Sequence, residues 1–149
     1  MIDINKVVRD HLLLNSALYT AVGGTRIYAG RNEPPSVGSK STGGYKPSDG
    51  GAVAFRVAGG MADYADALFN VRIQAKCYAG GTTTASTEFE AWELYRLVYD
   101  ALHNTTGAEI VHGEADALGN ILYEPGTDWC FVLAYFTLMV RNNESGGSL

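Results

Sequence analysis

The chain has 149 residues, 46% of them hydrophobic and 18% charged, which is enough for one domain with a real core and too few for two. A net charge of −5 argues against a dedicated nucleic-acid-binding protein. No apolar run approaches the roughly 18 residues of a membrane helix, so no membrane partner is expected. Cys77 and Cys130 lie inside apolar patterns and are expected to be buried free thiols.

The N-terminal segment predicts two short helices and a short strand. Asp3 has a side chain suited to capping the first helix. Asn15 is expected to cap a second helix over residues 17–22, which Gly23 ends, because glycine commonly follows a helix C-terminus. Residues 25–28 are a strand candidate.

Residues 31–51 are rich in glycine, proline and serine and predict a long loop. Residues 36–50 contain one valine and one tyrosine as apolar anchors, so we expect them to be mobile and to be cut first by a protease. If the loop has a role, the expected one is docking onto a neighbouring ring in an assembly.

Two strands are predicted next, over about 51–58 and 68–79. The second alternates strictly between an apolar and a polar side, a pattern typical of a strand with one dry and one wet face. The apolar side consists of Phe69, Val71, Ile73, Ala75 and Cys77, and the polar side of Asn70, Arg72, Gln74, Lys76 and Tyr78.

The strongest helix is predicted near 87–103, where Thr87 and Glu90 have the spacing of a capping box. A weak segment, 105–115, leads to a hairpin with arms at about 117–124 and 129–141. The last arm is apolar on both sides, which places it at the centre of the sheet with a cover on each face. The long helix is expected to cover one face, and the first helix or a neighbouring subunit the other.

These elements together predict an α+β fold in a single domain, 1–149. An antiparallel or mixed sheet of about four strands carries the long helix on one face, with an N-terminal helix beside it. Residues 31–51 form a flexible loop and residues 143–149 a short disordered tail.

No catalytic constellation is found in the sequence. The three histidines, His11, His103 and His112, lie far apart and have no ligand-spaced neighbours, so neither a metal site nor a cofactor is expected. The glycine- and threonine-rich loop at 79–84 precedes a helix, but it lacks the spacing and the lysine of a phosphate-binding loop. A small ligand-binding domain or enzyme that uses this loop remains an alternative.

The order of features resembles the tail terminator, or tail-completion, proteins of long-tailed bacteriophages. The resemblance lies in a helix that ends in a small–small–leucine pattern, a Val-Gly-Gly stop, an Arg-Ile-Tyr strand, the alternating strand and the long helix. In this chain these are Ala17-Leu18, Val22-Gly23-Gly24, Arg26-Ile27-Tyr28, 69–78 and 86–102.

The resemblance implies a mixed α+β fold and a homo-oligomeric ring, in that family a hexamer. Such a ring caps the tail tube, stops its polymerisation and joins the tail to the head connector. Its partners would be the tail tube protein and a connector or neck protein, with genomic DNA only passing through the lumen. The protein would lie in the tail or neck of the virion, after assembly in the host cytoplasm, and would have no catalytic activity and no cofactor. A neck or head-completion protein is the alternative within the same class.

Strand alternation also suggests an assembly surface. A basic, semi-apolar sheet face is expected to carry Arg56, Arg72, Gln74, Lys76 and Arg141, and the exposed side of the long helix Glu90, Glu93 and Asp100. Two complementary, non-identical surfaces favour heterologous contacts that close into rings. Reversing Arg72 and Lys76 to glutamate is then expected to leave the monomer folded but abolish rings. A merely solvated sheet face is the alternative.

Overall fold

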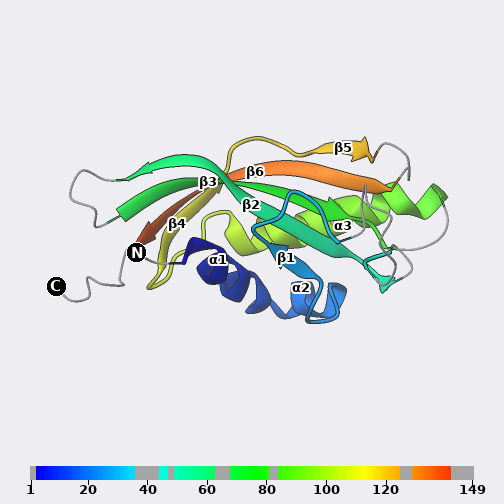
Figure 1. Cartoon of the computed structure of the whole chain (residues 1–149), viewed down its shortest axis with the longest axis horizontal. Coiled ribbons are helices and arrows are strands. Elements are labelled where there is room, and N and C mark those ends of the chain that lie inside the picture. Colours follow the sequence, from blue (N-terminus) through cyan, green and yellow to red (C-terminus); the bar gives the residue numbers. More distant parts are fainter. Residues whose placement is uncertain are drawn as a thin grey trace.

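The computed structural model describes residues 3–35, 44–46, 49–62, 68–80, 84–124 and 129–141. It confirms the α+β fold: a six-stranded, mostly antiparallel sheet carries all three helices on one side (Figure 1). The elements are α1 (Ile4–Leu13), α2 (Ser16–Ala21), β1 (Ile27–Ala29), β2 (Ala52–Ala62), β3 (Leu68–Tyr78), α3 (Thr84–Leu102), β4 (Ile110–Ala115), β5 (Asn120–Tyr123) and β6 (Cys130–Arg141).

Strand β6 lies inside the sheet, as its two apolar sides predict. The order is β1-β2-β3-β6, and both β4 and β5 pair with the other edge of β6. All these pairings are antiparallel except that of β1 with β2. One side of the sheet, the helix face, packs against the helices; we call the other side the open face.

The two predicted helix caps are confirmed. The backbone N–H of Lys6 donates to Asp3 Oδ1 at 3.2 Å, and that of Leu18 donates to Asn15 Oδ1 at 2.9 Å. These bonds satisfy amide groups that a helix N-terminus otherwise leaves unpaired. Gly23, which follows α2, has a φ of +62°, a conformation that glycine adopts without strain.

Two elements differ from the sequence predictions. The segment predicted to be weak, 105–115, contains strand β4, so the sheet has six strands rather than about four. The apolar and polar residues of β4 do not alternate strictly, because the pairing of β4 with β6 is irregular between Ile110 and His112. The capping box at Thr87 and Glu90 is also wrong, since α3 begins three residues earlier, at Thr84. The turn 125–128 and the tail 143–149 lie outside the described residues.

The main core lies between the helix face and the helices. Alternate residues of β3 and β6 face it, and Ile73 and Phe136 are completely buried against the apolar stripe of α3. Burying a side chain of this size stabilises the fold by about 1.5–3 kcal/mol. Both cysteines are free and buried, as predicted, and burial raises the pKa of the Cys77 thiol.

A smaller aromatic cluster covers one end of the open face. Tyr45, only 2% exposed, lies edge-on to the rings of Tyr78 and Trp129 and donates its hydroxyl hydrogen to Gly50 O at 2.9 Å. The first helix does not cover this face, contrary to one expectation, because α1 packs on the same side as α3. Within the segment expected to be mobile, Tyr45 is buried in this cluster; residues 36–43 and 47–48 lie outside the described residues.

We expect the two buried phenols of this cluster to make the protein sensitive to alkali. Burial raises the pKa of both Tyr45 and Tyr78 above the ordinary value of 10.0. The stabilisation of the folded state by these buried, protonated hydroxyl groups is complete below pH 10. It is lost as the pH rises above 10, because only the unfolded chain then releases the phenol protons. The free energy of unfolding should fall by about 1.4 kcal/mol per pH unit for each buried tyrosine. In urea titrations between pH 9 and about pH 11, Tyr45→Phe should show a shallower decline than the wild type; identical slopes would contradict the assignment.

Candidate assembly surface

Strand register places the five sheet residues of the predicted surface on the open face. Arg56 is opposite Gln74, and Arg72 and Lys76 lie on the same side of β3. Arg141 of β6 is opposite Leu68, which shares that side with them. The face assignment is confirmed.

Arg72 is engaged within the subunit. Its Nε donates to Asp116 Oδ2 at 2.9 Å, and its guanidinium carbon lies 4.1 Å from the centre of the Tyr135 ring. The second oxygen of Asp116 accepts a hydrogen bond from Thr137 Oγ1 at 2.6 Å. Asp116 therefore neutralises the cation and fixes its orientation.

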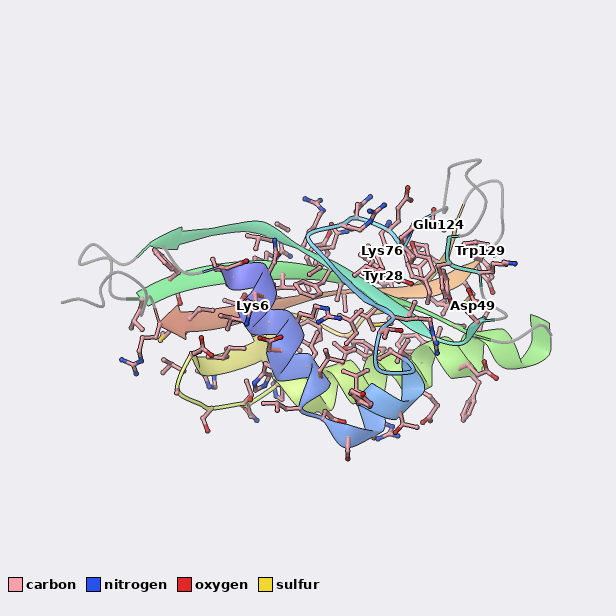
Figure 2. All side chains as sticks on the ribbon, turned by 60° about the horizontal axis from the view of Figure 1, so that its bottom comes forward. Lys6, Tyr28, Asp49, Lys76, Glu124 and Trp129 are labelled. Carbon is pink, nitrogen blue, oxygen red and sulfur yellow. The ribbon has the colours of Figure 1, made fainter. Side chains whose placement is uncertain are left out.

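Lys76 is also neutralised, in a largely buried position. Its Nζ lies 3.6 Å from Glu124 Oε1 and 4.9 Å from the centre of the Phe131 ring. The same carboxylate oxygen accepts a 2.5 Å hydrogen bond from the hydroxyl of Tyr78. Glu124 is only 7% exposed, so this triad joins the hairpin of β5 and β6 to β3. Figure 2 shows Lys76 and Glu124 together with Trp129 near one end of the sheet.

Gln74 is not exposed, which corrects the expectation that it faces outward into solvent. Its amide nitrogen donates to Asn32 Oδ1 at 2.8 Å, and its oxygen accepts from Arg56 Nη2 at 3.0 Å. The segment that carries Asn32 crosses the open face here and leaves Gln74 6% exposed. Arg56 itself remains exposed, and no acidic side chain of the described residues pairs with it.

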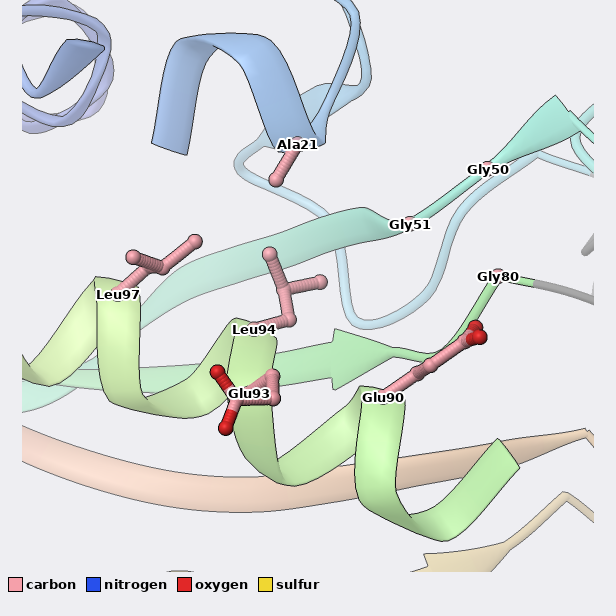
Figure 3. A pocket seen from close by; sticks show the side chains of 8 residues that line it. All are labelled: Ala21, Gly50, Gly51, Gly80, Glu90, Glu93, Leu94 and Leu97. Carbon is pink, nitrogen blue, oxygen red and sulfur yellow. The ribbon is translucent and has the colours of Figure 1, made fainter. Parts of the chain in front are cut away.

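The predicted acidic side of α3 is partly neutralised as well. Arg96 pairs with Glu93 at 3.1 Å and with Asp100 at 3.3 Å, one turn away on either side. Glu90 has no ion partner among the described residues and points toward Gly80 (Figure 3). It lines a pocket of about 380 Å³ together with Glu93, Leu94 and the backbone of the strand ends.

This pocket bears on the alternative that the glycine-rich loop binds a ligand. A Cβ atom on Gly80 would lie 2.6 Å from the carbonyl carbon of Gly50, so the glycine permits a close crossing of two backbones. Two carboxylates, from Glu90 and Glu93, line the same pocket and disfavour a nucleotide phosphate. Residues 81–83 of the loop lie outside the described residues.

His11 and His103 have different hydrogen-bond partners. His11 Nε2 is 2.9 Å from Ala101 O and from Thr105 Oγ1, whereas His103 Nδ1 accepts a hydrogen bond from the N–H of Ala115. No group of three or more His, Cys, Asp or Glu residues suited to a metal ion occurs in the described part of the chain. Within that part, no helix is long and apolar enough to cross a membrane.

No protein-family model matches the chain, and no curated protein matches it. Among solved structures, it is similar to a chain of the structure titled "Virion of native gene transfer agent (GTA) particle". The TM-score is 0.56 and the sequence identity 17%, and the match covers 91% of this chain and 92% of the other. The two chains therefore share a fold over nearly their whole lengths.

The sequence interpretation missed both acids that neutralise the open face. Asp116 is 44 residues from Arg72, and Glu124 is 46 residues from Tyr78. No local spacing signals pairs this far apart. Only the register of β4 and β5 on β6 carries these carboxylates to the face where the cations lie.

Proposed function

We propose that this chain is a structural protein of a phage or phage-like virion. The observation that carries the proposal is the end-to-end fold likeness to a chain of a gene transfer agent virion. In this role the protein acts by assembly and has no catalytic activity and no cofactor.

The finer proposal is a tail terminator. Copies of the chain form a ring, expected to be a hexamer, that caps the tail tube, stops its polymerisation and joins it to the head connector. The support is the resemblance of the helix stop and strand at 22–28, the alternating strand and α3 to that family. The ring would contact the tail tube protein and a neck protein, with DNA only in its lumen, in the tail or neck of a virion assembled in the host cytoplasm.

Within such a ring, the residues without an internal ion partner are the ones free to bind another subunit. Three charged residues of the eight predicted surface residues have no ion partner among the described residues. They are Arg56, Arg141 and Glu90. One exposed ion pair contributes less than about 1 kcal/mol, so these charges would act only as a repeated network. Reversing Arg72 and Lys76 is a poor test, because it would place glutamates beside Asp116 and the buried Glu124.

We expect purified protein to form rings of uniform diameter in negative-stain electron micrographs. Added to tail tubes of the same particle, the rings should sit at one tube end and stop further elongation. Tubes without the protein serve as the control. Rings that bind the isolated head connector but not the tube would favour the neck-protein alternative, and protein that stays monomeric with and without tubes would contradict the proposal.

A further inference from the structure

One edge of the sheet is left unpaired along β2. Strand β1 pairs with β2 only at Val53–Phe55. Here the N–H of Val53 donates to Arg26 O, and Phe55 O accepts from the N–H of Arg31. Because alternate residues of a strand point their backbone groups to the same edge, the N–H and C=O of Val57 point outward too. No described strand pairs with them, and the Val57 side chain is 37% exposed.

The opposite edge of the sheet is unpaired along β5. Glu124 N–H donates to Trp129 O, toward β6, so by the same alternation Ile121 and Tyr123 direct their backbone groups away from β6. Large apolar side chains are exposed around this edge. They are Leu118, Leu122 and Tyr123, and also Phe89 of α3, whose neighbour Glu88 accepts a hydrogen bond from the Tyr123 hydroxyl.

The other edges are protected. On β4, Gly113 O accepts from the N–H of Asn104 and the N–H of Ala115 donates to His103 Nδ1. On β1, Ile27 O accepts from Arg9 Nε, and α1 packs beside the strand. Exposed edges are normally covered or blunted because they invite pairing with another chain.

We propose that the β2 edge at Val57 pairs with the β5 edge of a second copy of this chain, so that the sheet continues from one subunit to the next. This inference rests on the proposed ring and specifies its subunit contact. The two edges lie at opposite ends of the strand order, β1-β2-β3-β6 with β5 outermost, so one copy can use both at once. Such a contact is heterologous and builds a ring when the rotation closes.

Side-chain chemistry selects a second copy as the occupant. In the antiparallel register that places exposed Val57 opposite exposed Tyr123 on the helix face, Leu122 lies on the open face, diagonally across from the aliphatic part of Arg56. The β2 edge is basic, with Arg31 and Arg56 both exposed. At the β5 edge, Glu88 is exposed and accepts a hydrogen bond from the Tyr123 hydroxyl, and it has no ion partner among the described residues; Asp116 and Glu124 are paired within the subunit. Opposite charges thus favour the edge of a neighbour over a symmetric contact.

Two edge variants and one control test the contact. Val57→Pro removes an outward N–H without removing a bond to β3, a position where an edge strand tolerates proline. Leu122→Arg places a cation diagonally across from Arg56 of the neighbouring copy. Leu14→Arg makes the same substitution at a leucine that is 81% exposed but lies on neither edge. By sedimentation velocity, Leu14→Arg should form rings like the wild type, and each edge variant should sediment as a monomer.

Mixing the two edge variants separates a heterologous from a symmetric contact. The Val57→Pro copy keeps its β5 edge and the Leu122→Arg copy keeps its β2 edge, so an equimolar mixture should form a one-to-one heterodimer and nothing larger. The mixture is measured well above the concentration at which wild-type rings form. If Val57→Pro melts well below the wild type, it is replaced by Val57→Glu, which places a carboxylate opposite Tyr123 and near Glu88 of the neighbouring copy.

Rings of either edge variant, a homodimer of either, or a mixture that stays monomeric would overturn the edge pairing. If the wild type forms rings and the edge variants form rings as well, the proposed function stands and only this subunit contact is wrong. Wild-type protein that forms no ring, alone or with tail tubes, would contradict both.

Discussion

Replacing Glu124 by glutamine is expected to lower the free energy of unfolding by about 3 kcal/mol. The variant keeps an oxygen that can accept the Tyr78 hydrogen bond, but it leaves the Lys76 ammonium without a counter-charge where only 12% of its side chain is exposed. Removing one partner of a buried ion pair is costly because the remaining charge has lost its hydration and gained nothing in return. Urea denaturation followed by circular dichroism measures the change.

The double variant Lys76→Met/Glu124→Gln is the matched control. It removes the buried charge as well, so its stability should return to within about 1 kcal/mol of the wild type. Glu88→Gln, at an exposed carboxylate that also accepts a tyrosine hydroxyl, should change the stability by less than about 0.5 kcal/mol. If Glu124→Gln alone is as stable as Glu88→Gln, Lys76 is not held by this carboxylate.

Gly80→Ala is expected to destabilise the fold by about 2–3 kcal/mol. The added Cβ would lie 2.6 Å from the carbonyl carbon of Gly50 and 2.7 Å from the nitrogen of Gly51. Both contacts are with backbone, so no side-chain rotation can relieve them, and the crossing of the strand ends must open. For a chain of this length the melting temperature should fall by roughly 5–10 °C.

Gly107→Ala is the control for this second prediction. The same added methyl group there would meet one atom, Ile110 O, at the ordinary distance of 3.5 Å. Its stability should stay within about 0.5 kcal/mol of the wild type. Equal stability of the two alanine variants would show that Gly80 is not required for close packing and would reopen the role of the 79–84 loop in binding.

The sequence predicted the local features well because they depend on neighbouring residues. Asp3 and Asn15 cap helices with their own side chains, and the alternation from Phe69 to Tyr78 separates two faces whatever the strand pairs with. The two-sided apolar pattern of β6 likewise required an interior position. By contrast, β4 has an irregular pattern of its own and is stabilised by pairing with β6, which periodicity does not detect.

The sequence by itself determined the α+β class, the central strand and the side of the sheet on which Arg56, Arg72, Gln74, Lys76 and Arg141 lie. Those properties follow from a two-residue repeat that is fixed by backbone geometry. Only the tertiary structure decided which of these side chains remain available. Long-range strand register brings Asp116 to Arg72 and Glu124 to Lys76 and lays Asn32 over Gln74, while Arg56 keeps its charge at an open sheet edge. Pairings across more than 40 residues depend on how distant strands align, and no local pattern in the chain encodes that alignment.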